Sequence, residues 1–458
     1  MKRPYLKPRE PSGMEWWTYL SFAAVIYVAT IVSLRMLYPE KHLDWSIIDE
    51  TQRTFPESFQ WGVATASHQI EGGNSNNWTE FETRSNIEES GDACDHWNRW
   101  QEDFQLLEEL GVATYRFSLE WSRIEPEKGQ WNAEALQQYS DMIDDLCRRG
   151  IRPMITLHHF SHPQWFEQRE GFLDKDNIGL WVHYCEKVFE RYCDRVTDWC
   201  TVNEPEVFSI MGYFMKMFPP GKRSLRSTLT VMRNVVQAHG IVYHRLKQHN
   251  PVCRIGLAKN VTLFDPLKRW NLLHWTTSAA LNFVWNGAIV RALKKGTMFG
   301  KKMPLVRGSL DFIGLNYYTH VLTSPFLPQT NEVNFPKRSH ETMTDFGYPM
   351  YAEGLERAVK MLETLEVPIE ITENGTADQH DTLRPIHLQR HVWMVSELLQ
   401  QGHDIRSYYH WSLMDNFEWA EGYSLRFGLY HVDYQTQVRT LRQSGSIYRD
   451  IINEASQD

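Results

Sequence analysis

Two glutamates stand where short apolar runs end, and their positions suggest chemistry. Glu204 belongs to "TVNEP" (201–205) and Glu373 to "ITENG" (371–375). Turn-forming residues, a proline and an Asn-Gly pair, follow them, as is usual at the end of a strand. One such glutamate is in most proteins a helix cap or a salt-bridge partner. Two carboxyl groups that face one cleft can instead act together, one as an acid or base and the other as a nucleophile or a second base.

A repeated pattern of strand-like and helix-like segments would bring these glutamates together. Helix-like stretches such as 132–150, with apolar residues at a spacing near 3.6 and a closing glycine, separate short apolar runs. Eight alternations predict an α/β fold, a (β/α)8 barrel, in which the carboxyl ends of the strands surround the active site. Glu204 and Glu373 close the fourth and seventh runs, so both should face the barrel mouth. The eight runs are 59–65, 113–119, 152–158, 196–203, 254–260, 310–316, 367–372 and 405–411.

Cleavage of a glycosidic bond is the chemistry that uses two carboxyl groups across a cleft. One group donates a proton to the leaving oxygen, while the other attacks the anomeric carbon or activates water. A separation of ~5–5.5 Å between the two groups is required for the retaining mechanism.

Composition limits the alternatives. The 458 residues, 42% hydrophobic and 23% charged, are enough for one large barrel with a packed core. A net charge of −9 without a long basic stripe argues against a nucleic-acid partner. Most of the 18 tryptophans should pack in the core, and the six cysteines, which lack zinc-ligand spacing, are interpreted as buried thiols. Neither an HExxH motif nor a Gly-rich phosphate loop is present, so we expect no metal and no cofactor.

The N-terminal region predicts a membrane anchor. Positions 16–34 contain no charged side chain over 19 residues, close to the ~20 that a helix needs to cross a bilayer. Because no small-residue cleavage site follows, we predict a single-pass transmembrane anchor at 16–38 rather than a removed signal peptide; a buried core helix is the alternative. The short basic tail at 1–15 places the N-terminus in the cytoplasm and the large domain on the opposite side. A polar connector at 39–54 then leads to the barrel domain at 55–458.

Five motifs in collinear order resemble glycoside hydrolase family 1, the β-glucosidase family. The resemblance extends from about residue 59 to about residue 448 and implies a (β/α)8 barrel that hydrolyses β-glycosides with retention of configuration. The motifs are "YRFSLEWSRIEP" (115–126), "TVNEP" (201–205), "DFIGLNYYT" (311–319), "ITENG" (371–375) and "WSLMDNFEWAEGYSLRFGL" (411–429).

The resemblance implies a role for each matched residue. Glu204 would be the general acid/base and Glu373 the nucleophile, while Asn203 would bind the sugar 2-hydroxyl. Arg116 and Tyr318 would hold Glu373 ionised, because a nearby cation and a phenol donor favour a charged carboxylate. A drier or more negative setting should raise the pKa of Glu204, which must start protonated.

The resemblance also implies residues that hold the sugar. His159 would contact the 3-hydroxyl and Trp411 would form a hydrophobic floor, although both could be ordinary core residues. Gln69 and Glu418 are harder to explain as structural, because buried polar groups need partners. The implied set is Gln69, His159, Trp411, Glu418 and Trp419, with Asn316 beside the nucleophile.

Departures from the family pattern leave the sugar and aglycone preference open. Phe160 and Tyr348 stand where the family usually has tryptophan. The aromatic-rich segment 270–285 is interpreted as an ordinary barrel helix or as an apolar rim that accepts a lipid tail. Segments 371–385 and 438–452, together with the N-terminal span, resemble the branch that contains the plant galactolipid galactosyltransferase.

The sequence therefore predicts a membrane-anchored retaining β-glycosidase that acts on β-glucosides, β-galactosides or glycolipids. The first alternative is a glycolipid transglycosidase, and the second is a catalytically inactive, membrane-anchored glycan-binding protein. The oligomeric state stays open.

Overall fold

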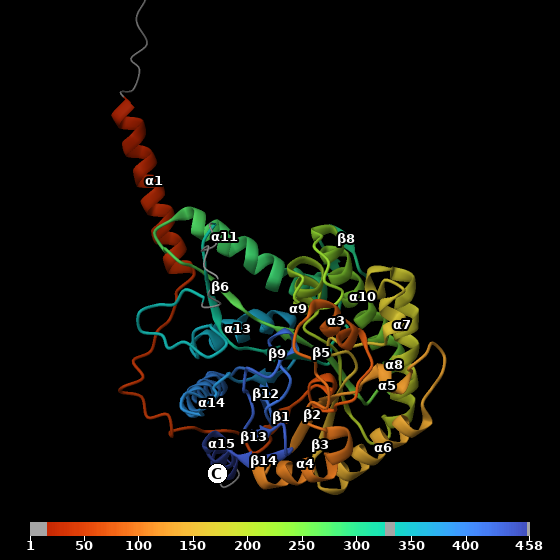
Figure 1. Ribbon diagram of the computed structural model, residues 1–458. Helices are drawn as coiled ribbons and strands as arrows, with labels where there is room; N and C mark the ends of the chain where they lie inside the picture. Colours follow the sequence, from red (N-terminus) through yellow and green to blue (C-terminus); the bar gives the residue numbers. More distant parts are fainter. Residues whose placement is uncertain (1–15, 326–334, 456–458) are drawn as a thin grey trace, which may run out of the picture.

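The computed structural model describes residues 16–325 and 335–455 (Figure 1), so the predicted basic tail at 1–15 lies outside the described residues. Eight parallel strands form a closed barrel in the order β1-β12-β11-β9-β5-β4-β3-β2, which confirms the predicted (β/α)8 architecture. Each of the eight predicted runs coincides with one barrel strand, and β11 continues beyond its run through Glu373 to Asn374. The strands are β1 (Gln60–Ala64), β2 (Thr114–Ser118), β3 (Arg152–Thr156), β4 (Asp198–Asn203), β5 (Arg254–Asn260), β9 (Phe312–Asn316), β11 (Ile369–Asn374) and β12 (Ile405–Trp411).

The helices between the strands cover the outside of the barrel, as helix α6 illustrates. Asn132 caps its first turn, because the side-chain oxygen accepts from the backbone N–H of Ala135 at 3.1 Å. Gly150, with φ of 75°, lets the chain leave the helix. The covering helices include α4 (His96–Leu110), α6 (Ala133–Arg148), α8 (Ile178–Tyr192), α10 (Leu225–His249), α13 (Gly354–Leu362), α14 (Arg384–Gln400) and α15 (Gln443–Ala455).

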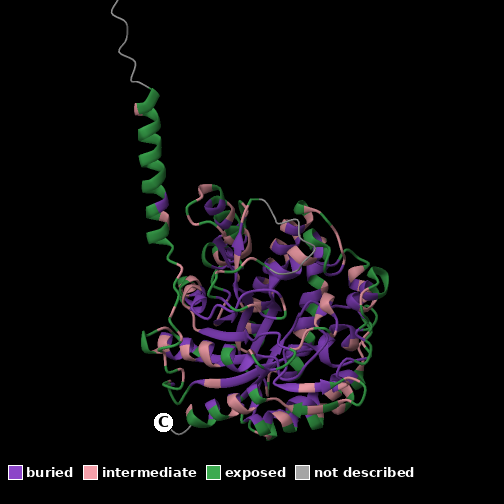
Figure 2. Cartoon of the chain, turned by 60° about the vertical axis from the view of Figure 1, so that its left-hand side comes forward, coloured by how far each residue is buried: buried purple, intermediate pink, exposed green. Residues whose placement is uncertain are grey.

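The strands are buried on both faces, as expected for a parallel sheet that helices cover. Figure 2 shows this contrast, with a buried centre and exposed outer helices. Four tryptophans are among the largest fully buried side chains: Trp78, Trp121, Trp181 and Trp199. The interpretation of all six cysteines as buried thiols is wrong for two of them. Cys147 is exposed and Cys193 is half-buried, because both lie near the ends of surface helices.

Helix α1 (Trp16–Leu37) extends away from the barrel (Figures 1 and 2) and exposes nearly all of its side chains. Within the described ranges it is the one helix long and apolar enough to cross a membrane. The segment 39–54 that follows is packed on the barrel. The indole of Trp45 donates to Glu353 at 3.0 Å and its ring meets Trp393 of α14 at 5.6 Å.

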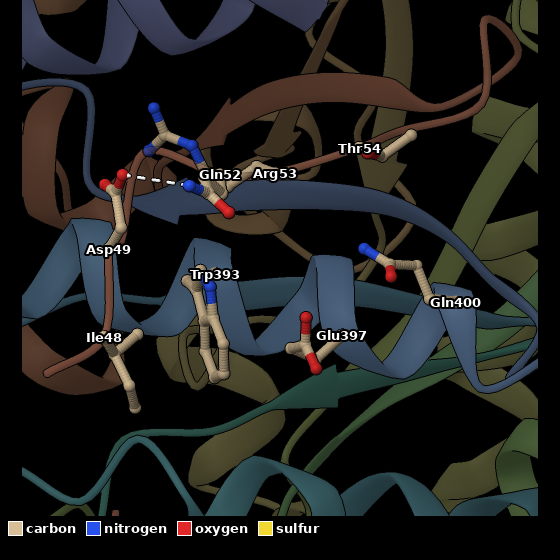
Figure 3. Close-up of a pocket in the computed structure, with 8 residues that line it drawn as sticks. All are labelled: Ile48, Asp49, Gln52, Arg53, Thr54, Trp393, Glu397 and Gln400. Carbon is tan, nitrogen blue, oxygen red and sulfur yellow. Dashed lines mark hydrogen bonds between the residues drawn. The ribbon is translucent and has the colours of Figure 1, made fainter. Parts of the chain in front are cut away.

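This segment and α14 also enclose a pocket of about 470 Å³ (Figure 3). The pocket lies on the helical outside of the barrel, and the amide of Gln52 donates to Asp49 at its edge. None of the residues that line it is a predicted site residue: Ile48, Asp49, Gln52, Arg53, Thr54, Trp393, Glu397 and Gln400. The candidate site therefore lies elsewhere.

Candidate active site

Glu204 and Glu373 both lie at the carboxyl end of the barrel. Glu204 directly follows β4 and precedes the short helix α9 (Pro205–Ile210), and Glu373 pairs with Asn316 at the end of β9. The φ of Glu204 is 43°, a conformation that non-glycine residues rarely adopt and that is concentrated at functional sites. Both side chains are buried, at 6% and 3% exposure. The fold thus brings together the two carboxyl groups that the sequence placed on different strands.

Glu373 has charged and phenolic partners. Arg116 Nη1 donates to Glu373 Oε1 at 2.5 Å, and the Tyr318 hydroxyl donates to Oε2 at 2.6 Å. Burial raises the pKa of Glu373, whereas the guanidinium of Arg116 and the hydrogen bond from Tyr318 act in the opposite direction. A carboxyl group with a buried cation in contact is the one of the pair that ionises first.

Glu204 has neutral partners. The side-chain amides of Asn316 and Asn260 donate to its Oε1 at 2.8 Å and 3.1 Å. Burial, followed by the negative charge of Glu373, raises the pKa of Glu204 to about 8. Glu204 therefore holds a proton at neutral pH.

Asn203 connects the two halves of the site. Its Oδ1 accepts from Arg116 Nη2 at 2.6 Å and from Asn316 Nδ2 at 3.1 Å, and its amide nitrogen lies 3.0 Å from His159 Nε2. Because the amide donates, His159 Nε2 accepts and its proton lies on Nδ1. This buried Nδ1 has no partner among the described residues, and burial lowers the pKa of His159 well below its usual value. A neutral imidazole thus has one N–H free for a ligand.

Gln69 and Glu418 form a second polar group. Gln69 Nε2 donates to Asn416 Oδ1 at 2.9 Å and to Glu418 Oε2 at 3.2 Å, while Gln69 Oε1 is buried without a partner among the described side chains. Burial, with a further contribution from the charge of Glu373, raises the pKa of Glu418 to about 8. A buried acceptor without a partner is costly unless a ligand satisfies it.

Aromatic rings line the same region. The His159 ring lies 5.7 Å from that of Trp411 and 5.9 Å from that of Trp419, and Phe160 meets Trp419 edge-on at 5.1 Å. The residue that departs from the family pattern at position 160 thus supports a predicted sugar-binding tryptophan. Flat apolar surfaces beside polar groups are typical of small-ligand sites.

The glycine of "ITENG" has a packing reason. A Cβ atom at Gly375 would lie 1.8 Å from the carbonyl oxygen of Trp411. Only glycine allows the turn after β11 to approach the end of β12 this closely. Close backbone contact therefore explains why a glycine stands two residues after Glu373.

Three residues that sequence reasoning missed also contribute. Asn260 is the second donor to Glu204, and Lys259 Nζ donates to Glu206 Oε1 at 2.9 Å with both side chains fully buried. The charge of Glu206 is a further cause of the raised pKa of Glu204. A lysine and an extra glutamate at apolar strand ends were the signal that could have indicated this buried pair.

Among the described residues, two groups of side chains outside this site have a geometry that could hold a metal ion. Their histidine nitrogens already make hydrogen bonds or ion pairs. The ring of His320, for example, lies between Asp265 (2.9 Å) and Glu341 (2.8 Å), and its hydrogen bonds to these carboxylates raise the pKa of His320 to about 9. The groups are His42, His340 and Glu341, and Glu40, Asp265 and His320. Neither contains a candidate catalytic residue.

The chain is similar to known proteins over most of its length. The chain is 33% identical to "Beta-glucosidase A" of Thermotoga maritima over 437 residues, covering 87% of this chain and 98% of that protein. It is 34% identical to "Beta-glucosidase" of Agrobacterium sp. over 435 residues, covering 86% of this chain and 94% of the relative.

Solved structures show the same likeness. The "beta-glycosidase from Pyrococcus horikoshii" superposes with a TM-score of 0.81 at 37% identity, covering 88% of this chain and 95% of that one. The Thermotoga maritima β-glucosidase in complex with glucoimidazole superposes with a TM-score of 0.83 at 31% identity, covering 89% of this chain and 100% of that one. The model for "Glycosyl hydrolase family 1" matches residues 51–457. The chain belongs to glycosyl hydrolase family 1 and is a glycoside hydrolase.

Proposed function

We propose that Glu373 is the nucleophile and Glu204 the general acid/base of a retaining β-glycosidase. The observation that carries this assignment is the difference between the partners of the two groups. Glu373 is held by a guanidinium and a phenol, whereas Glu204 is held by two amides and keeps its proton. The relatives, which are β-glucosidases, support the substrate class.

The reaction would proceed in two steps. The Glu373 carboxylate attacks the anomeric carbon while the proton of Glu204 moves to the leaving oxygen, which gives a covalent glycosyl-enzyme. The bond to Glu373 removes its negative charge, so the pKa of Glu204 falls. Glu204 then accepts a proton from water, and the activated water releases the sugar with retained configuration.

The supporting roles are part of the same proposal. Asn203, held by Arg116 and Asn316, would bind the 2-hydroxyl, a contact that strengthens in the transition state. The unpartnered atoms His159 Nδ1 and Gln69 Oε1 would meet sugar hydroxyls. The remaining predicted residues would enclose the ring: Glu418, Trp411 and Trp419.

Rescue by azide tests the two roles separately. In Glu204→Ala, an activated aryl β-glucoside can still form the glycosyl-enzyme, and azide should attack it to give the β-glycosyl azide. In Glu373→Ala, azide should enter where the carboxylate stood and give the α-glycosyl azide. If the two anomers were reversed, the two assignments would be exchanged. If neither variant formed an azide adduct, both assignments would be refuted. Glu102→Ala, at a side chain with 65% exposure, is the control and should keep wild-type activity without azide.

The two alternatives differ from this proposal in testable ways. A transglycosidase would use the same two glutamates but pass the sugar to another glycoside, so its products would be one sugar larger than the substrate. An inactive glycan-binding protein would give no product. The presence of both carboxyl groups with their partners favours an active enzyme.

We also propose that α1 anchors the enzyme in a membrane. Its length, its apolar composition and its exposure to solvent support this, and the matched family region begins only at residue 51. The protein should stay with membranes after alkaline carbonate washing, and release into the supernatant would refute the anchor. The predicted orientation, with the N-terminus in the cytoplasm, is tested by protease protection of sealed vesicles.

A further inference from the structure

The segment that follows strand β6 (Leu263–Pro266) presents an apolar outer face. Helix α11 (Leu272–Asn282) continues into the π-helical turn η4 (Phe283–Gly287), and positions 271–290 contain no Asp, Glu, Lys or Arg. A helix that faces water normally carries charged residues on its outer side, so this α11–η4 face is typical of an interaction surface. Its most exposed large apolar side chains are Leu273 (60%), Phe283 (48%) and Leu281 (38%), and Trp270 (62%) lies just before it in the chain.

The α11–η4 face begins beside the candidate membrane helix. The Tyr27 hydroxyl of α1 donates to the backbone oxygen of Trp270 at 2.6 Å, and the ring of Tyr38 lies 6.2 Å from that of Trp275. Ten residues separate Tyr27 from Leu37 at the end of α1, which corresponds to about 15 Å along the axis. A bilayer that α1 crosses therefore also surrounds Trp270.

Ion pairs and hydrogen bonds fix the end of α1 relative to this face. Arg338 makes a bidentate ion pair with Glu40, at 2.8 Å for both bonds, and donates to the backbone oxygens of Leu267 and Pro266. Arg269 donates to the backbone oxygen of Tyr38 at 2.7 Å. The start of α11 and the end of α1 are thus joined by contacts rather than by a free linker.

Positive charge accompanies the apolar face. No acidic residue occurs between Asp265 and Asp311, although eight basic residues do, in a chain with a net charge of −9. Figure 1 shows α11 and β8 (Lys301–Lys302) at the end of the barrel from which α1 leaves. An apolar segment with lysines and arginines before and after it in the sequence matches a bilayer that contains anionic lipids. The basic residues are Lys268, Arg269, Arg291, Lys294, Lys295, Lys301, Lys302 and Arg307.

The inner side of the same segment reaches the active site. Trp285 of η4 donates to Asn260 Oδ1 at 3.1 Å, and the amide of Asn260 donates to Glu204 at 3.1 Å. If Glu204 protonates the leaving oxygen, the aglycone must lie on the Glu204 side of the bond that breaks. The leaving group therefore departs next to the segment whose outer face meets the membrane.

We propose that the α11–η4 face docks into the bilayer that α1 crosses, and that the substrate is a β-glycoside whose aglycone is a lipid of that bilayer. The substrate class rests on the proposed glycosidase reaction. The docking of the face rests on the proposed membrane anchoring by α1 and is independent of that reaction. The sugar enters the barrel mouth while the lipid chains stay in the membrane.

A comparison of two substrates tests the substrate class. The full-length enzyme is reconstituted in vesicles that contain anionic phospholipid and a β-glucosyl diacylglycerol, and a water-soluble aryl β-glucoside is assayed in the same vesicles. The double variant Leu273→Glu/Ala280→Glu should lower the rate on the glycolipid at least tenfold and change the rate on the aryl glucoside less than twofold. An unchanged ratio of the two rates would overturn the proposal, including the case in which both rates fall together.

Val252→Glu is the matched control. Val252 is 79% exposed and lies in the turn before β5, so a charge there should change neither rate. A wild-type enzyme that cleaves neither substrate would refute the proposed function, and the docking of the face would still be decided by a second measurement.

Spin labels measure the docking without activity. Ala280→Cys and Val252→Cys are labelled in a Cys147→Ser/Cys193→Ser background, because Cys147 is exposed and Cys193 is half-buried. In the same vesicles, the label at 280 should be accessible to oxygen and protected from an aqueous paramagnetic reagent, whereas the label at 252 should show the reverse. Equal accessibility of both labels to the aqueous reagent would overturn the docking.

Discussion

Replacing Glu204 by Gln should stabilise the protein while it removes the acid catalyst. The environment of Glu204 raises its pKa from the usual 4.5 to about 8. Between these two values the native state keeps a proton that the unfolded state has lost, so the free energy of unfolding falls as pH rises through this window. Gln does not titrate. Its amide group offers one acceptor and one donor in the arrangement of the protonated carboxyl group, so the bonds from Asn316 and Asn260 can persist.

The size of the effect follows from the pKa shift. Each pH unit above 4.5 lowers the free energy of unfolding of the wild type by about 1.4 kcal/mol. The free energy of unfolding of Glu204→Gln should therefore exceed that of the wild type by nearly zero at pH 4 and by about 3.4 kcal/mol at pH 7. For a domain of about 400 residues the entropy of unfolding is ~0.8 kcal/mol/K. The variant should therefore melt about 4 °C above the wild type at pH 7.

Thermal unfolding of the detergent-solubilised full chain at pH 4, 5.5 and 7 checks this expectation. Glu102→Gln, at an exposed side chain, should show a difference in Tm that does not grow with pH. The rate of Glu204→Gln on substrates with poor leaving groups should fall about 10²–10⁴-fold. A Tm difference that is the same at pH 4 and pH 7 would refute the reasoning, because Glu204 would then ionise like an exposed glutamate.

Three further predictions follow from the contacts of the site. Tyr318→Phe removes a donor that favours the ionised form of Glu373. The acid limb of the pH profile of kcat/KM should therefore move to higher pH, while the alkaline limb stays near pH 8. An acid limb that does not move would contradict this prediction. Lys259→Met leaves the buried Glu206 without a cation and should lower the free energy of unfolding by about 3–5 kcal/mol, and adding Glu206→Gln should recover most of this loss in the melting temperature. Gln69→Ala should lower kcat/KM on β-glucosides roughly 30-fold, which corresponds to a loss of about 2 kcal/mol of transition-state stabilisation, with little change in Tm. A loss of stability without a loss of activity would assign Gln69 a structural role.

The sequence predicted the barrel because its strands carry a signal that does not depend on distant partners. Each run is short, apolar and followed by turn residues, and all eight became barrel strands. Glu204 and Glu373 could be singled out because charged residues at the ends of apolar runs are conspicuous. Their spatial relation followed from the barrel, in which all carboxyl ends meet.

Other features depend on side-chain register, which the sequence does not reveal. The contact of Asn260 with Glu204 and the pair formed by Lys259 and Glu206 join neighbouring strands and the helix after β4. The aromatic segment 270–285 left two interpretations open, and its exposed face beside α1 supports the apolar rim. The prediction that the Cys147 thiol is buried was wrong because Cys147 lies in the last turn of α6. The sequence pattern of a helix does not show whether its last turn is covered by other residues.

The central claim is that a covalent bond forms between the sugar and Glu373. A 2-deoxy-2-fluoro β-glucoside with a good leaving group slows the release of the sugar more than its attachment, because the fluorine destabilises both transition states and the leaving group accelerates only the first step. Mass spectrometry of the digested protein should then show the fluoroglucosyl group on the peptide that contains Glu373, and Glu373→Gln should carry no label. A label on another residue, or complete turnover to a sugar of inverted configuration without any label, would contradict the account.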